Sequence, residues 1–168
     1  MPSIALTNSF SPNTKIKSAE VNKNFIDNRT FIGFYAYRSL VDVEVNSADT
    51  IVCDLEQYDV GGNYSTGSGL FTAPVAGYYH FDCLTAYNVL ADTRYGFYLT
   101  GSVVGQFALV YHHTSVVSGL YLAGSRTIHL SLNETVTFAV FETEAGTATL
   151  LGSTIHFSNF SGYLIAKD

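Results

Sequence analysis

After residue 30, apolar and polar residues alternate along most of the chain. The segment 41–45 alternates valine with acidic residues, 79–87 alternates aromatic or small residues with polar ones, and 127–132 repeats the pattern. A period of two places successive side chains on opposite faces, which predicts half-buried β-strands. Clusters of Gly, Asn and Ser, such as Gly61-Gly62-Asn63, separate these segments. Short strands that recur with turn signals predict an all-β sandwich or barrel.

Residues 1–30 differ from the rest of the chain. They are rich in Asn, Ser and Thr, and Pro2 and Pro12 interrupt regular structure. Ser18 is a suitable cap for a short helix that follows it, but a helix of about ten residues is marginal on its own. We therefore expect two parts, a terminal segment over 1–30 that orders against a partner and a β-domain over 31–168.

Composition adds one unusual feature, which is a low content of charge. Only 13% of the 168 residues are charged, against about 25% in ordinary soluble proteins, whereas 14% are aromatic. Mean hydropathy is only +0.18, and no apolar run approaches the ~20 residues of a membrane helix, so we predict no membrane insertion. A single copy with so few charges would be poorly soluble. We therefore expect much of its surface to be covered by further copies of the chain.

The charges are also unevenly placed. Residues 1–30 carry four basic and two acidic residues, a net charge of +2, whereas residues 31–166 carry three arginines and eleven acids, a net charge of −8. Phosphate contacts need clustered Lys or Arg, so the main body is not expected to bind nucleic acid. Cys53 and Cys83 are too few for a disulfide scaffold and are interpreted as small hydrophobes. A single bridge between the two is the alternative.

The segment Asn63–Phe81 carries a spaced pattern of aromatic, Gly and Pro residues, and a second aromatic–Gly pair lies near the C-terminal end. The residues of this pattern are Tyr64, Gly69, Phe71, Pro74, Gly77, Tyr79 and Phe81, followed by Phe160 and Gly162. The pattern resembles the globular-head family of complement component one q and tumour necrosis factor. Over about residues 31–166, the resemblance implies a ten-stranded jelly-roll β-sandwich that assembles as a homotrimer.

The N-terminal segment resembles a short motif of bacteriophage fibre and virion-appendage proteins. The residues that carry this resemblance are Phe10, Ile16, Val21, Asn22, Asn24 and Phe25. It implies an anchor over residues 1–30 that binds other virion proteins and a trimeric knob that follows it. On this interpretation the protein is made in the host cytoplasm and lies on the virion surface.

Catalytic chemistry finds little support in the sequence. The candidates for acid–base or metal chemistry are His80, His112, His113, His129 and His156. His112 and His113 are adjacent, so in a strand they face opposite sides and cannot share one metal ion. The chain has no GxSxG, HExxH, paired CxxC or P-loop motif. We therefore predict a protein that is not an enzyme, with no catalytic residue, cofactor or metal ligand.

Acidic residues gather between positions 42 and 59. They are Asp42, Glu44, Asp49, Asp54, Glu56 and Asp59. Calcium takes roughly six to eight oxygens from a compact loop, and these acids lack such spacing. We interpret them as solvated charges that protect strand edges. Three copies on one axis could still build a shared ion site, and this alternative stays open.

The tyrosines are too numerous to fill the core of one small sandwich. We expect most of them in the core and in the contacts between copies, because a tyrosine ring buries a large area while its hydroxyl finds a partner. Tyr87, Tyr95 and Tyr111 are instead the candidates for loop residues that contact a receptor.

The main functional hypothesis is therefore a bacteriophage fibre knob that binds a protein or glycan of the host surface. One alternative is a purely structural virion protein, such as a capsid decoration or a fibre tip. The other is a secreted complement-like ligand-binding module.

Overall fold

The computed structural model of the chain describes residues 31–39, 41–89, 93–102, 105–114, 118–142, 148–153 and 156–168. The chain divides into two units, Met1–Phe31 with Asp168 and Ile32–Lys167, and the fold below is that of the second unit. The helix expected after Ser18 lies outside the described residues. The same holds for the predicted anchor residues Phe10, Ile16, Val21, Asn22, Asn24 and Phe25.

Every regular element in the described residues is a β-strand. The strands are β1 (Gly33–Tyr37), β2 (Val43–Val45), β3 (Leu55–Val60), β4 (Tyr64–Ser65), β5 (Leu70–Thr72), β6 (Gly77–Val89), β7 (Thr93–Gly101), β8 (Gly105–Thr114), β9 (Ser118–Leu130), β10 (Thr135–Glu142), β11 (Ala148–Leu150) and β12 (Asn159–Lys167). The described part of the chain contains no helix that is long and apolar enough to cross a membrane.

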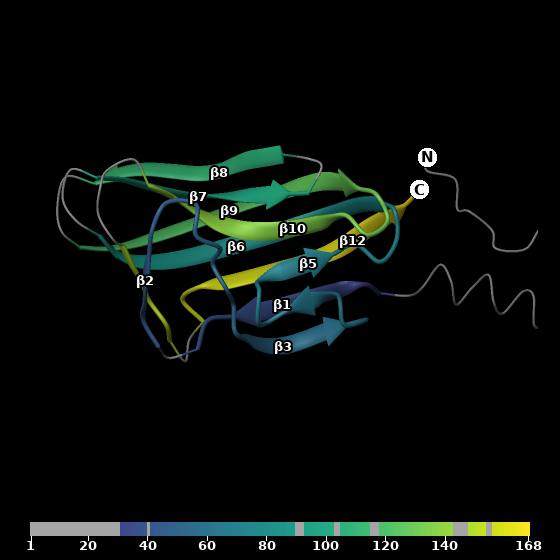
Figure 1. Ribbon diagram of the computed structural model, residues 1–168, viewed down its shortest axis with the longest axis horizontal. Coiled ribbons are helices and arrows are strands. Elements are labelled where there is room, and N and C mark those ends of the chain that lie inside the picture. Colours follow the sequence, from purple (N-terminus) through teal and green to yellow (C-terminus); the bar gives the residue numbers. More distant parts are fainter. Residues whose placement is uncertain are drawn as a thin grey trace, which may run out of the picture. The chain divides into compact units, whose positions relative to one another are not determined.

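The strands form two antiparallel sheets (Figure 1). Sheet A has the order β2-β11-β6-β12-β1-β3, and β9 pairs with the other edge of β6; sheet B has the order β4-β5-β10-β7-β8. The all-β jelly-roll sandwich is therefore confirmed. Twelve strands are described where the resemblance implied ten, and four of them (β2, β4, β5 and β11) have only two or three residues.

The core lies between the two sheets and follows the predicted period of two. On β6, the side chains of Tyr79, Phe81 and Cys83 are buried, whereas Tyr78 and Asp82 are exposed. Aromatic rings fill the centre of the sandwich. Phe34 stacks on Tyr64 at 4.7 Å and on Phe71 at 5.2 Å between ring centroids, and meets Phe160 edge-on at 5.0 Å. These contacts between strands distant in sequence fix the two sheets against each other.

Two glycines of the family pattern are required by this packing. Gly69 has φ +70°, a conformation that residues with a Cβ rarely adopt, so it forms the turn into β5. Gly162 on β12 lies under two rings, since a Cβ there would come within 2.5 Å of Phe81 and 2.9 Å of Phe34. The pattern therefore marks places where backbone and rings approach too closely for any side chain.

Candidate interaction surface

The main exposed feature of the fold is the outer face of sheet A, the side turned away from sheet B. Ten large hydrophobic side chains are exposed in the described residues, and seven of them lie on strands of this sheet. They are Leu55, Tyr58 and Val60 on β3, Tyr78 on β6, Tyr121 on β9, and Tyr163 and Ile165 on β12. Exposed fractions run from 42% for Tyr163 to 56% for Tyr121. A large apolar patch of this kind marks an interaction surface.

The strand register places these side chains on one face of the sheet. Tyr58 on β3 lies opposite Tyr35 on β1, and their rings stack at 6.4 Å. Further along the sheet, Tyr163 on β12 lies opposite His80 on β6, at 5.5 Å between ring centroids. Because paired residues of adjacent strands point to the same side, all these side chains share one face; Tyr121, which lies opposite Ala86, is near the other end of β6 from Tyr78.

The described histidine side chains all belong to this face. His129 meets the ring of Tyr78 edge-on at 5.0 Å. His156, just before β12, stacks on Tyr37 at 3.6 Å between ring centroids, and its Nδ1 lies 3.1 Å from the Tyr35 hydroxyl.

His80 has a polar partner at each ring nitrogen. Its Nε2 is 3.3 Å from Oδ1 of Asp82, and its Nδ1 is 2.9 Å from the Thr127 hydroxyl. His112 and His113 lie on β8, but their side chains are outside the described residues. The described residues hold no group of three metal-ligating side chains.

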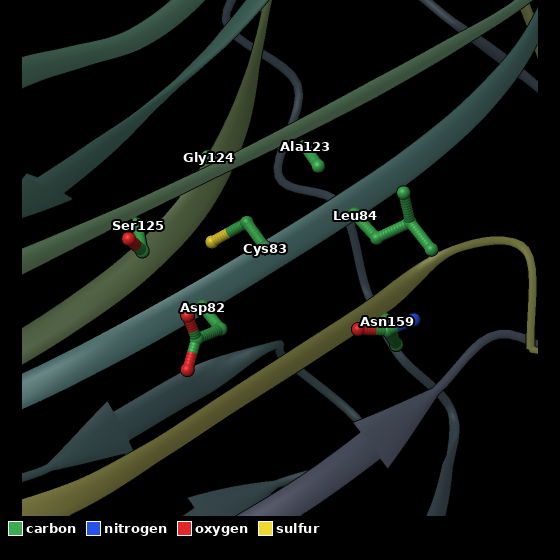
Figure 2. Close-up of a pocket in the computed structure, with 7 residues that line it drawn as sticks. All are labelled: Asp82, Cys83, Leu84, Ala123, Gly124, Ser125 and Asn159. Atoms are coloured by element: carbon green, nitrogen blue, oxygen red, sulfur yellow. The ribbon is translucent and has the colours of Figure 1, made fainter.

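A hollow of about 380 Å³ opens beside Asp82, the carboxylate of this pair, and Figure 2 shows the residues that line it. It is lined by Asp82, Cys83 and Leu84 of β6, by Ala123, Gly124 and Ser125 of β9, and by Asn159 of β12. The side-chain amide of Asn159 donates to the His156 carbonyl at 2.9 Å, so its oxygen remains as an acceptor. The polar groups of this lining are therefore the Asp82 carboxylate, the Ser125 hydroxyl and the Asn159 amide, and the Cys83 thiol beside them is buried.

Both cysteines are buried free thiols, so the alternative of a disulfide between Cys53 and Cys83 is not realised in this structure. Cys53 lies in the loop before β3, not in a strand, and Cys83 lies on β6. Burial raises the pKa of the Cys53 thiol to about 12 and raises the pKa of Cys83 well above its usual range. Both thiols are therefore protonated at neutral pH and act as core residues.

Most of the acidic residues between positions 42 and 59 accept hydrogen bonds from backbone N–H groups. This differs from the expectation that they are solvated charges at strand edges. Oδ1 of Asp54 accepts from the Ser39 N–H at 2.7 Å, and Asp42 accepts from the Gly152 N–H at 2.9 Å. Asp49 and Asp59 likewise accept from backbone N–H groups. Burial alone would raise the pKa of Asp54, but the hydrogen bonds from the hydroxyl and N–H of Ser39 outweigh it and lower that pKa. These carboxylates hold turns together, which explains their clustering near positions 42–59.

The residues of the family pattern form the core. Tyr64, Phe71, Tyr79, Phe81 and Phe160 are each at most 6% exposed. The Tyr64 hydroxyl accepts from the Cys53 N–H and donates to the Cys53 carbonyl, both at 3.1 Å. The remaining members, Gly69, Pro74, Gly77 and Gly162, lie in turns or strands next to this core. The pattern therefore supports the fold and does not itself form a ligand site.

Two of the three predicted receptor contacts need correction. Tyr87 is on β6 and Tyr95 on β7, both side chains are 0% exposed, and their rings stack at 6.2 Å. Tyr87 is a core residue because β6 extends to Val89, two residues past it, and pairs with β9 over that length; Tyr95 is a core residue of β7. Tyr111 lies on β8, and its side chain is outside the described residues.

Comparison with known proteins agrees with this architecture. The globular domain of zebrafish complement 1qA superposes with a TM-score of 0.67 at 18% identity, covering 82% of this chain and 99% of that one. Eiger TNF from S. frugiperda gives a TM-score of 0.62 at 15% identity, with 83% and 96% covered. Murine APRIL gives 0.57 at 13% identity, with 80% and 99% covered.

No curated protein sequence matches the chain. At these identities the structural likeness establishes the fold alone. A family model for the C1q domain, however, matches residues 33–165, which is most of the chain. The chain therefore belongs to the C1q domain family.

Proposed function

We propose that this protein is a non-enzymatic binding head that assembles as a homotrimer through the outer face of sheet A. The observation that carries the proposal is the concentration of exposed apolar side chains there, with seven of the ten in the described residues on one sheet. Scattered exposed hydrophobic residues need no explanation, but the gathering of tyrosine, leucine, isoleucine and valine on one face of one sheet does. Tyrosine enrichment with few charges is typical of the buried centre of a protein–protein interface.

A second copy is the favoured occupant of this face. The face extends across the whole sheet from β3 to β9, and most soluble oligomers are assembled from identical subunits around a closed symmetry axis. A threefold assembly needs two different parts of one surface to meet, and the face offers an aliphatic margin on β3 and a hollow between β6 and β9.

We further propose that the head is displayed on a bacteriophage virion, where residues 1–30 attach it to other virion proteins. The support is the resemblance of Phe10, Ile16 and the Val21–Phe25 segment to virion-appendage proteins. The contrast between four basic residues in this segment and an acidic body is consistent with separate roles for the two parts.

Adhesion to a host protein or glycan is the role proposed for the knob. The burial of Tyr87 and Tyr95 removes two of its three candidate contacts, and this favours the second candidate function, a purely structural virion protein. Purified protein that adsorbs to host cells and blocks infection would support adhesion. Protein that neither adsorbs to host cells nor blocks infection would instead support the purely structural virion role.

Self-association has a matched test in two aliphatic residues. Ile165 on β12 is 54% exposed on the proposed surface, and Leu132, in the turn after β9 and outside the strands of sheet A, is 58% exposed. Light scattering of the unmodified chain should give about 55 kDa, three times the 18.3 kDa of one copy. Ile165→Ser should shift the mass toward one copy, whereas Leu132→Ser should not. An unmodified chain that stays at 18 kDa would refute the proposal.

A further inference from the structure

His80 lies near the middle of the proposed self-association surface, on the central strand β6. Each of its ring nitrogens has an oxygen partner, Asp82 at 3.3 Å from Nε2 and Thr127 at 2.9 Å from Nδ1. A neutral imidazole carries one N–H, but an imidazolium carries two. The site therefore satisfies the doubly protonated ring, with a carboxylate as the acceptor of one proton and a hydroxyl as the acceptor of the other.

The groups that face His80 from neighbouring strands also favour a positive charge. Tyr163 on β12 presents its ring at 5.5 Å, and the face of an aromatic ring attracts cations. Ser125, Thr127 and His129 are the polar side chains on the β9 side, and His129 packs against Tyr78. The nearest arginine along β9, Arg126, pairs in register with Phe81. It is therefore on the opposite side of the sheet from His80.

Self-association changes the environment of this pair. The side chain of His80 is 24% exposed in one copy and that of Asp82 is 53% exposed, so water screens the carboxylate. Covering the face removes that water from three copies of Asp82 at once. A carboxylate buried without a cation is strongly disfavoured, whereas a buried and hydrogen-bonded ion pair is tolerated.

We propose that His80 and Asp82 form a proton-dependent lock, in which protonated His80 neutralises Asp82 and tightens the association of copies through the outer face of sheet A. The proposal rests on the self-association proposed above and assigns its regulation. Histidine is the side chain that changes charge between pH 5 and 8. We therefore expect association through this face to be tighter at pH 6 than at pH 8.

The test is the rate at which copies exchange between two preparations of the full chain that carry different fluorophores at the amino terminus. Exchange reports on tight assemblies as well as weak ones. If each copy takes up one proton on association, the association constant changes by at most about tenfold per pH unit for each copy. We expect exchange to be about tenfold or more slower at pH 6 than at pH 8.

Two substitutions give opposite expectations and so separate the lock from simple loss of structure. Asp82→Asn removes the charge that needs neutralising, so exchange should be slow at both pH values. His80→Gln keeps an amide that can reach both partners but cannot be protonated, so exchange should be fast at both. His129→Gln, on the same face, is the control and should keep the pH dependence of the unmodified chain.

The two proposals fail in different ways. A chain with the mass of one copy at both pH values would refute self-association and the lock together. An assembly whose exchange is equally fast at pH 6 and pH 8, or one whose pH dependence survives in His80→Gln, would refute the lock and leave the self-association proposal intact.

Discussion

Gly162→Ala should destabilise the sandwich by an amount that can be worked from the packing around it. A Cβ at this position would lie 2.5 and 2.7 Å from two carbons of the Phe81 ring and 2.9 Å from one carbon of the Phe34 ring. Neither ring has room to move away. Phe34 is held by Tyr64 at 4.7 Å, and Phe81 is held by Phe160 at 5.6 Å, with all these rings at the centre of the core.

Adding one carbon to a well-packed core typically costs about 1–3 kcal/mol, and two confined rings place this substitution at the upper end, about 3 kcal/mol. For a chain of this length, that corresponds to a loss of about 6–12 °C in Tm. Urea unfolding followed by circular dichroism, at one fixed protein concentration, measures the change. Gly67→Ala is the matched control, because a Cβ there meets nothing within 4 Å. Equal unfolding midpoints for the two variants would refute the reasoning.

Two further substitutions test the loop contacts. Tyr64→Phe leaves the buried N–H and C=O of Cys53 without the hydroxyl that bonds both, so the free energy of unfolding should fall by about 1–3 kcal/mol in urea; an unchanged midpoint would contradict this. Ser39→Ala removes the hydrogen bond from its hydroxyl that helps to lower the pKa of Asp54 and keeps the one from its backbone N–H. A lowered carboxyl pKa stabilises the fold above the unfolded value and loses that effect as pH falls through the folded value. The stability difference between Ser39→Ala and the unmodified chain should therefore be largest near pH 7 and shrink toward pH 3, and a constant difference would argue against this role of Asp54.

The strand pattern and the family residues were predictable because both depend on local spacing. Alternation over 79–87 identifies the odd-numbered side chains of β6 as those that face the core, and all five are buried, although Ala86 between the last two is buried as well. The alternating segment already includes Tyr87, and its period of two places the Tyr87 side chain on the core face with Tyr79. The interpretation of Tyr87 as a loop residue ended the strand too early. Strand length depends on pairing with β9, which a local pattern does not contain.

Contacts between distant loops could not be predicted for the same reason. Ser39 and Asp54 are 15 residues apart, and their pairing depends on how the loops on either side of β2 cross. The segment around Thr50 was also missed. It bridges to Ala139 and continues the edge of β10 where β5 ends, although it has no alternation of its own. The central role of His80 likewise needed the register that sets it beside Thr127.

Tyrosines and phenylalanines occupy different places in the fold, and this explains how a chain with so little charge can expose the outer face of sheet A. Within the described part of residues 32–167, the large aromatic side chains that are exposed, Tyr58, Tyr78, Tyr121 and Tyr163, are all tyrosines, whereas Phe34, Phe81 and Phe160 are fully buried. A tyrosine hydroxyl keeps its hydrogen bonds to water while a copy is alone, and its ring still buries a large area when copies meet. The core of one copy is already closed by its own rings. The core of a single head is therefore complete without a partner, and the self-association proposed above would cover a surface that its hydroxyl groups already hydrate.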